Sequence, residues 1–261
     1  MPKRAKGAKA MKGRPITMEE YERMLMAVPK VVGEEATSSW QYYLEGLWWS
    51  GLRLAESLDL YWDRQDKLSV DLTGRRPMLR IPAELEKGNQ NRLLAMAPEF
   101  AKFLLRTPPE DRKGRVFKLK APVRQPGWAM RSDTIGKRVC DIGRKAAVKV
   151  EETTRKGKPH IKFASAHDLR RSFGERWALR VMPQVLMELM RHESIDTTMQ
   201  FYVGRNAERT ADALWAAVEE KPLRAILRAT DQNEGTVEEP RNEKTPGNPE
   251  VIKYTRQESN L

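Results

Sequence analysis

The chain has 261 residues and a formal net charge of +12 at pH 7, from 48 Lys and Arg against 36 Asp and Glu. No run of about 18 or more apolar residues occurs and no apolar segment follows the basic N-terminus, so we expect neither a transmembrane helix nor a secretory signal. The single cysteine, Cys140, excludes a disulfide framework and a cysteine-based zinc site and fits a reducing compartment, and the positive charge favours a polyanionic partner, most often nucleic acid.

The charge divides the chain into three parts. Residues 1–14 carry +6 without an acidic residue, which predicts a flexible basic arm. Residues 231–261 contain seven acidic and four basic residues among Pro, Gly and Asn, which predicts a disordered tail. The part between them, 15–230, carries +9 and is long enough to form one folded domain.

The predicted elements begin with a helix near residue 17. Thr17 and Glu20 form a capping-box pattern, and apolar residues then recur at helical spacing. A second helix is predicted to open at Ser38 or Ser39 and to break near 50–51. It is followed by a short helical piece over 52–60.

Between residues 67 and 97 the pattern changes from helical spacing to short alternating runs. These runs are separated by Gly, Arg and Pro, and they predict a small antiparallel sheet. The strands are expected within 68–72, 78–82 and 92–96, with turns at 73–74 and 87–88.

The rest of the folded part is predicted to be helical apart from one loop. Pro98 fits the first turn of one helix, and Ser132 is the expected N-cap of another. The segment 151–162, which contains Lys and Gly, is expected to be a loop. Helical stretches are expected at 167–180, 183–190, 195–203 and 206–228. The predicted fold class is mainly α with a small antiparallel three-stranded sheet (α+β).

Three local patterns place cationic side chains near chain turns. They are GLRLAE at 51–56, AHDLRR at 166–171 and HESIDTTMQFY at 192–202. Arginine forks and imidazoles stabilise the charge that spreads over a phosphate during phosphoryl transfer. A tyrosine oxygen can act as a covalent nucleophile that conserves the bond as a phosphoester.

Each pattern also has an ordinary explanation when it is taken alone. His167 and Arg170 share a helix face by their spacing, as many surface pairs do. Arg53 can simply pair with Glu56 or with water, and His192 can interact with the dipole of a helix end. The order and context of the three patterns together favour phosphoryl-transfer chemistry.

Together these motifs resemble the catalytic domain of tyrosine recombinases of the phage-integrase type. The resemblance extends from about residue 15 to about residue 218. The family's G-L-R-x-x-E pattern matches 51–56, its K-G-N-x-x-R hairpin motif matches 87–92, its H-x-L-R-R box matches 167–171, and its final His with S-I-x-T-T matches 192–198.

The resemblance implies a site-specific recombinase that cuts and rejoins DNA strands through a 3′-phosphotyrosyl intermediate. Its partners would be double-stranded DNA and further copies of the chain, assembled as a tetramer on DNA in the cytoplasm, with the bacterial nucleoid. No metal, nucleotide cofactor, membrane or small-molecule substrate is implied. The implied catalytic residues are Arg53, Lys87, His167, Arg170, His192 and Tyr202.

The resemblance also assigns a role to each of these residues. Arg53, Arg170 and His192 would hold the scissile phosphate and stabilise the transition state. Lys87 would protonate the departing 5′-hydroxyl, and His167 would assist proton transfer as a general acid or base. Tyr202 would be the nucleophile, with Glu56 orienting Arg53. Further phosphate contacts are expected from Arg75, Arg76, Arg92, Lys137, Arg138, Arg144 and Lys145.

The position of the nucleophile departs from the family pattern. The family places its tyrosine nine residues after the last motif histidine, where this chain has Phe201, and Tyr202 is the tenth. One residue of helix corresponds to ~100° of rotation and ~1.5 Å of rise. Three interpretations are open: Tyr202 acts in an altered register, the protein does not cleave DNA, or another tyrosine acts.

A second departure concerns the front of the chain. Family members usually carry a helical core-binding domain before the catalytic one, and this chain is expected to lack it, as a fragment, a shortened gene or a minimal member. Half of a DNA clamp predicts weak, salt-sensitive binding. The alternatives to a recombinase are a catalytically silent DNA-binding relative and a topoisomerase-like enzyme that cuts and rejoins one strand.

Overall fold

The structure is a computed structural model that describes residues 13–83, 91–122, 131–155 and 158–202, together with Ala211 and Trp215. The chain divides into two compact units, Met1–Arg205 and Asn206–Leu261. In the second unit the described residues are Ala211 and Trp215, which are helical and exposed. Residues 1–12 of the predicted arm 1–14, Lys87 with its turn, nearly all of the predicted helix 206–228 and the predicted tail 231–261 lie outside the described residues.

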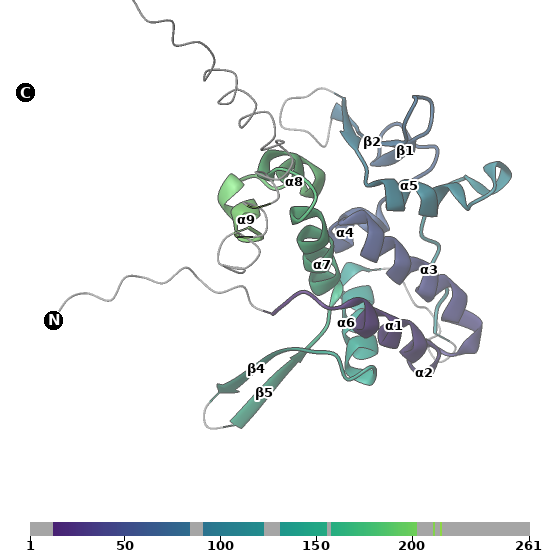
Figure 1. Ribbon diagram of the computed structural model, residues 1–261. Helices are drawn as coiled ribbons and strands as arrows, with labels where there is room; N and C mark the ends of the chain where they lie inside the picture. Colours follow the sequence, from purple (N-terminus) through teal and green to yellow (C-terminus); the bar gives the residue numbers. More distant parts are fainter. Residues whose placement is uncertain are drawn as a thin grey trace, which may run out of the picture. The chain divides into compact units, whose positions relative to one another are not determined.

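The first unit is mainly helical with two small antiparallel sheets, which confirms the predicted fold class (Figure 1). Among the described residues, no helix combines the length and apolar character that crossing a membrane requires. The helices are α1 Met18–Ala27, α2 Pro29–Val32, α3 Glu34–Ser50, α4 Leu54–Leu58, α5 Pro98–Leu105, the 3-10 turn η2 Pro109–Asp111, α6 Ser132–Lys145, α7 Ala166–Ala178, α8 Pro183–Met190 and α9 Ile195–Met199.

Helix α1 begins with the predicted capping box. The Thr17 hydroxyl accepts from the Glu20 amide at 3.2 Å, and the Glu20 carboxylate accepts from the Thr17 amide at 3.0 Å. The segment before this cap crosses α7, because the Ile16 amide donates to the Ser172 hydroxyl at 2.8 Å. Arg14 donates to Glu20 at 2.5 Å and to the Lys149 carbonyl at 2.8 Å, so the entry of the chain is bonded to the domain body.

The start of α3 differs from the prediction. The helix begins at Glu34, before Ser38 and Ser39, and Glu34 and Glu35 occupy its first turn, where acidic residues complement the helix dipole. The Ser39 hydroxyl donates to the Ala36 carbonyl at 2.7 Å within the helix and caps nothing. The expected cap at Ser132 is also wrong, because the N-cap of α6 is Arg131 and no side chain caps that end.

The three-stranded sheet forms in the predicted place. Its order is β1-β2-β3, and both pairings are antiparallel. Leu79 pairs with Val70 on one side and Leu94 on the other, and all three are buried. The strands are β1 Ser69–Asp71, β2 Met78–Ile81 and β3 Arg92–Ala95.

The expected loop 151–162 is instead part of a second antiparallel hairpin. Its strands are β4 Lys149–Arg155 and β5 Lys158–Phe163, and Figure 1 shows them projecting beyond α6. Period-two alternation begins with buried Val148 and Val150 around exposed Lys149, and β-branched residues continue it along the strand. The segment expected to be a loop therefore supplies most of both strands of a projecting hairpin. The predicted helix 195–203 is shorter than expected and ends at Met199.

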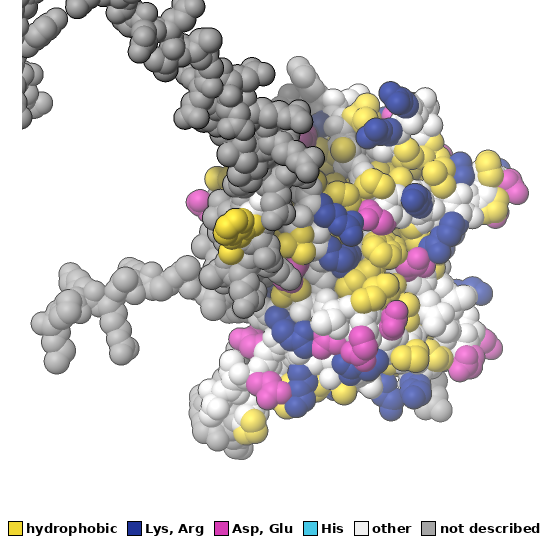
Figure 2. Space-filling model, viewed as in Figure 1, with side chains coloured by type: hydrophobic (Ala, Val, Ile, Leu, Met, Phe, Trp, Pro, Cys, Tyr) yellow, Lys and Arg dark blue, Asp and Glu magenta, His cyan; other side chains and the backbone are white. Residues whose placement is uncertain are grey.

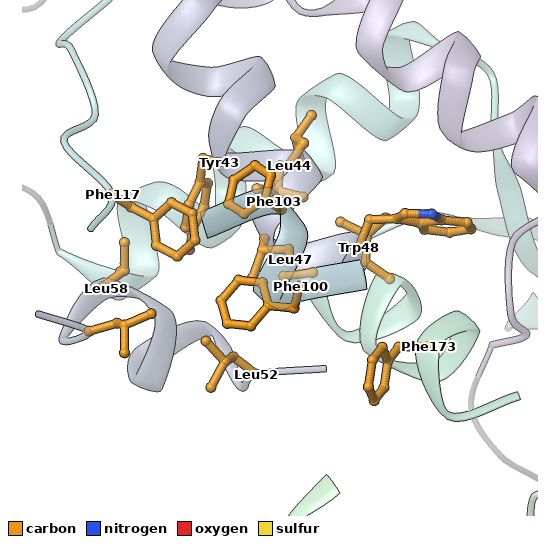
Figure 3. Close-up of a cluster of buried hydrophobic side chains, with 14 of the residues drawn as sticks. Tyr43, Leu44, Leu47, Trp48, Leu52, Leu58, Phe100, Phe103, Phe117 and Phe173 are labelled. Atoms are coloured by element: carbon orange, nitrogen blue, oxygen red, sulfur yellow. The ribbon is translucent and has the colours of Figure 1, made fainter. Parts of the chain in front are cut away.

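The core is organised around α3, whose buried face carries several aromatic and leucine side chains. Figure 3 shows Tyr43 of this helix beside Phe103 and Phe117. The Tyr43 and Phe117 rings are 5.2 Å apart at 74°, and the Phe100 and Phe103 rings are 5.9 Å apart. This packing fixes the C-terminal end of α3, from which the candidate site begins.

Candidate active site

Gly51 is the point at which three parts of the chain meet. It follows α3 in the left-handed conformation, with φ 61° and ψ 15°, and a Cβ at this position would overlap the ring of Phe173. Glycine is therefore required here on both steric and conformational grounds. The Gly51 carbonyl accepts from Arg170 of α7 and, at 3.4 Å, from Nη2 of Arg191 just after α8.

Arg170 is buried beneath this junction, with 5% of its surface exposed. Its Nη1 donates to the Gly51 carbonyl and its Nη2 to the Met190 carbonyl. Burial, reinforced by the nearby charges of Arg191 and Arg53, lowers the pKa of Arg170 to about 9, so the guanidinium keeps its proton at neutral pH. Two backbone carbonyls from different elements thus hold a positive charge in a fixed orientation.

Arg53 is the N-cap residue of α4 and is half exposed. Its Nη1 donates to Glu56 Oε1 at 2.7 Å, and its Nη2 donates to the Arg191 carbonyl at 2.8 Å. The pairing with Glu56 anticipated from the sequence is therefore present. The exposed part of the guanidinium lines a pocket.

Glu56 is shared between two arginines. Its Oε2 accepts from Arg191 Nη2 at 2.7 Å and from the Arg53 amide at 2.7 Å. Burial acts to raise the pKa of this carboxyl, but the charge and hydrogen bonds of Arg191 and the hydrogen bonds of Arg53 outweigh it and bring the pKa to about 2. Glu56 is consequently ionised at neutral pH, and Arg53 and Arg191 share its single negative charge.

Burial and neighbouring positive charges keep both motif histidines neutral. His192 Nδ1 lies 2.8 Å from the Thr198 hydroxyl. Burial, followed by the charges of Arg170, Arg53 and Arg191, lowers the pKa of His192 to about 4. His167, the second residue of α7, has its pKa lowered by desolvation first and by the Arg171 charge second. Both imidazoles are therefore uncharged donors and acceptors at pH 7.

Phe201 and Tyr202 lie in a turn after α9 and face different surroundings. The Phe201 ring is 6% exposed and stacks on His192, with centroids 6.0 Å apart and planes 14° apart. A Cβ on Gly174 of α7 would lie 2.7 Å from this ring, so the ring needs the glycine. The Tyr202 hydroxyl donates to the Val181 carbonyl at 2.7 Å, and burial raises its pKa.

A pocket of about 820 Å³ opens beside these groups. Arg53, Glu56, Arg191 and His192 line one side of it. The three-stranded sheet contributes Arg92, a predicted phosphate contact, whose Nη2 lies 3.5 Å from Glu188. The remaining lining includes apolar Ala55, Leu68, Ile81 and Met187 and the carboxylates of Asp59, Glu188 and Glu193. Among the described residues, no group of three or more His, Cys, Asp and Glu has an arrangement that could hold a metal ion.

Solved structures with the same arrangement of elements are recombinases and integrases. The lambda integrase dimer bound to a COC′ core site aligns with a TM-score of 0.51 at 14% identity, over 76% of this chain and 63% of that one. The Tn1549 transposon integrase in complex with transposon right end DNA aligns with a TM-score of 0.50 at 18% identity, over 81% and 68%. XerA recombinase aligns at 0.47 and 21% identity, over 85% and 67%.

The chain has the fold of a tyrosine-recombinase catalytic domain. No protein-family model matches the sequence, and no curated protein matches it. At 14–21% identity, the similarity to these recombinases and integrases therefore lies in the fold rather than in the sequence. The chain covers about two thirds of the length of these solved structures.

Within this recombinase fold, the predicted residues are only partly brought together. Arg53 and His192 line one pocket, and Arg170 lies behind them, attached through the Gly51 and Met190 carbonyls. Lys87 lies outside the described residues. Tyr202 makes its hydrogen bond to Val181, and among the described residues none joins its hydroxyl to the arginines or histidines of the pocket.

Sequence reasoning missed two residues that hold the candidate site together. Arg191 bonds to Glu56 and Gly51, and its only signal in the sequence is a basic residue directly before His192. Asp168 is fully buried within the H-x-L-R-R box, where it accepts from the Ser165 amide at 3.0 Å and pairs with Arg171. Its side chain anchors the helix turn that carries His167.

Proposed function

We propose that this chain is a site-specific tyrosine recombinase that cuts and rejoins double-stranded DNA. The observation that carries the proposal is that Arg53 and Arg191 line one wall of the pocket and share the single carboxylate of Glu56, with the buried charge of Arg170 behind them. These four residues together carry a net positive charge and present fixed donors, which suit the negative oxygens of a phosphodiester. The Tn1549 and lambda integrases, which share the fold, are described in complex with DNA.

The proposed reaction uses the residues in distinct roles. Arg53 donates to a non-bridging oxygen of the scissile phosphate, and His192 adds a neutral imidazole donor. Arg170 donates to the phosphate after exchanging one of its bonds to the Gly51 and Met190 carbonyls for it. The Tyr202 oxygen attacks phosphorus and passes its proton to the neutral imidazole of His167, which acts as the general base. The bond to the 5′-oxygen breaks, and that oxygen takes a proton from Lys87. The 5′-hydroxyl of a second strand then attacks the phosphotyrosine and releases Tyr202. One phosphoester replaces another, so no bond is hydrolysed.

Tyr202 must move before it can attack in this scheme. In the structure its hydroxyl is bonded to Val181, and the ring of Phe201 occupies the place beside His192. Because α9 is short and Phe201 and Tyr202 lie in a turn, a change of this turn moves Tyr202 without unwinding a long helix. The proposal therefore includes repositioning of the turn when DNA binds.

A second candidate function is supported by the same turn. Phe201 stands nine residues after His192, is buried, and packs against Gly174 as an ordinary core residue. A chain that retained the arginine pocket and left its tyrosine bonded to Val181 would bind DNA without cutting it. This is the catalytically silent DNA-binding relative.

A trapping experiment separates the two functions. The substrate is a pool of short random-sequence duplexes nicked on one strand, because loss of the fragment beside the nick traps a covalent intermediate. Binding of the pool is measured first by fluorescence anisotropy, and adducts are then mapped to peptides by mass spectrometry. The variants are Tyr202→Phe and the double variant Phe201→Tyr with Tyr202→Phe.

The outcomes are distinct. An adduct on the Tyr202 peptide that disappears in Tyr202→Phe supports the recombinase. Binding without an adduct in the wild type, with an adduct in the double variant only, supports the silent relative and indicates that the tyrosine stands one position too late. Absence of binding contradicts both functions.

A further inference from the structure

Arg191 occupies a backbone conformation that few side chains adopt. It follows the last residue of α8 with φ 51° and ψ 49°, in the left-handed region. Among the described residues, the one other non-glycine residue with positive φ is Ala147, at φ 55°. Because this conformation disfavours residues other than Gly, Asn and Asp, the contacts of the Arg191 side chain must offset its cost.

The side chain of Arg191 is 12% exposed and joins three segments of the site. Nη2 donates to Glu56 Oε2 at 2.7 Å and lies 3.4 Å from the Gly51 carbonyl, and Nη1 donates to the Leu189 carbonyl at 3.3 Å. The backbone carbonyl of the same residue accepts from Arg53 Nη2 at 2.8 Å. Arg191 therefore contacts Arg53 directly through its carbonyl and indirectly through Glu56.

The shared carboxylate has an electrostatic consequence. If Arg53 were the sole partner of Glu56, the pair would be neutral and Arg53 would have little net charge to offer to an anion. Because Oε1 accepts from Arg53 and Oε2 accepts from Arg191, two guanidinium groups share one negative charge. The three-residue group keeps a net positive charge beside the pocket, to which buried Arg170 adds a further one.

We propose that Arg191 is a positioning residue of the phosphate pocket, which fixes Arg53 through Glu56, holds the backbone that leads into His192, and keeps a net positive charge on the wall of the pocket that Arg53 and His192 line. The inference rests on the proposed function for the identity of the anion, a DNA phosphodiester. It assigns Arg191 no contact with the phosphate, because its guanidinium is already occupied by Glu56 and backbone carbonyls.

The first readout is the titration of His192, which does not depend on DNA. The chain has three histidines, at 160, 167 and 192, so their ring protons can be followed individually by NMR. The positive charges that face His192 are Arg170 from α7, Arg53 before α4 and Arg191 after α8, and the titratable neighbour is His167 of α7. All four groups disfavour the imidazolium of His192. Removing one of these charges must therefore raise the pKa of His192.

Three variants and one control separate charge from backbone strain. Arg191→Asn removes the charge and tolerates the left-handed backbone, Arg191→Gly removes the charge and the strain, and Arg191→Lys keeps the charge without the fork. Ala147→Gly relieves the same kind of strain at a site that does not line the pocket. Asparagine tolerates the left-handed backbone, so Arg191→Asn should fold even if another of these variants does not.

The expected result is a measurable rise in the pKa of His192 in Arg191→Asn and Arg191→Gly, because each removes one of the charges that disfavour its imidazolium. Arg191→Lys and Ala147→Gly should leave the pKa of His192 near its wild-type value. A pKa of His192 that stays the same in both uncharged variants overturns the inference, as does an equal rise in Ala147→Gly.

The second readout is the affinity of the full chain for a short duplex of fixed sequence, measured by anisotropy at constant salt. The uncharged variants should bind roughly tenfold more weakly than the wild type, and Ala147→Gly should bind equally well. Wild-type affinity in Arg191→Asn and Arg191→Gly overturns the inference. If the wild type itself binds no duplex, the proposed function fails, and the His192 titration still decides whether Arg191 sets the charge of this pocket.

Discussion

The hydroxyl of Tyr202 donates a 2.7 Å hydrogen bond to the backbone carbonyl of Val181. A single neutral hydrogen bond contributes about 0.5–1.5 kcal/mol to stability, so breaking it to free the tyrosine costs little compared with the binding energy of a DNA duplex. Burial raises the pKa of Tyr202 in this position, which keeps the phenol protonated. The bond thus keeps the proposed nucleophile away from the pocket at a small energetic cost.

The first prediction concerns the stability of the Tyr202→Phe variant. It removes the bond to Val181 and leaves the ring, so we expect its free energy of unfolding to fall by no more than about 1.5 kcal/mol. Phe201→Ala removes a buried ring and should cost about 3–5 kcal/mol. Urea unfolding of both variants measures the difference, and equal losses would show that the two side chains do not have the different environments described above.

The second prediction uses the close approach of α7 to the turn after α9. In Gly174→Ala the new Cβ would lie 2.6 Å from Met190 Sδ and 2.7 Å from Phe201 Cε1, so we expect a loss of about 1–3 kcal/mol from overpacking. Gly136→Ala in α6 is the matched control, since its Cβ meets only the end of the Leu54 side chain, at 3.1 Å. Thermal unfolding should show a clear decrease for the first variant and little change or a gain for the second.

The third prediction is a pH dependence that Glu56 contributes. Its pKa is lowered from 4.5 to about 2 in the folded chain, so its stabilisation is present above pH 4.5 and is lost as the pH falls toward 2. The shift corresponds to roughly 3 kcal/mol as an upper bound. The difference in free energy of unfolding between wild type and Glu56→Gln, measured in urea at several pH values, should shrink across this window. A difference that is constant with pH would contradict the assignment.

The fourth prediction concerns the anchor of α7. Asp168 is fully buried against Arg171, and removing one partner of a buried ion pair typically costs about 3–5 kcal/mol. Asp168→Asn should therefore destabilise the domain strongly. Asp141→Asn is the control, because Asp141 pairs with Arg144 at 2.8 Å on the surface and such pairs contribute at most about 1 kcal/mol. Comparable losses in the two variants would overturn the prediction.

Most elements could be predicted because their signals are local. The capping box at Thr17 and the proline at position 98 act within one helical turn, and both mark true helix starts. The hairpin over 149–163 could not be predicted from its composition, because the lysines of an exposed hairpin give the same polar composition as a loop. The serine caps predicted for α3 and α6 are wrong, because serine is a frequent cap but not an obligatory one. Here α3 begins with two acidic residues, and no side chain caps the start of α6.

The candidate site could be predicted only as far as its motifs extend. Arg53 and His192 line one pocket as the motif order suggested, whereas the link between them depends on Arg191, whose role arises from contacts with Glu56 and Gly51 that are far away in the sequence. Figure 2 illustrates why net charge did not locate this site: on the face shown, Lys and Arg side chains are interspersed with acidic and apolar ones. Position and pairing, rather than the number of basic residues, define the pocket.

The bond between the Ile16 amide and the Ser172 hydroxyl has a mechanical consequence. The Ser172 hydroxyl donates in turn to the Asp168 carbonyl at 2.8 Å, so the entering chain is bonded to the first turns of the helix that carries His167 and Arg170. Tension applied to the chain ahead of residue 13 therefore pulls on α7 before it reaches the aromatic core. A force applied at that end has a short path to Arg170, proposed to bind the phosphate, and to His167, proposed to assist proton transfer.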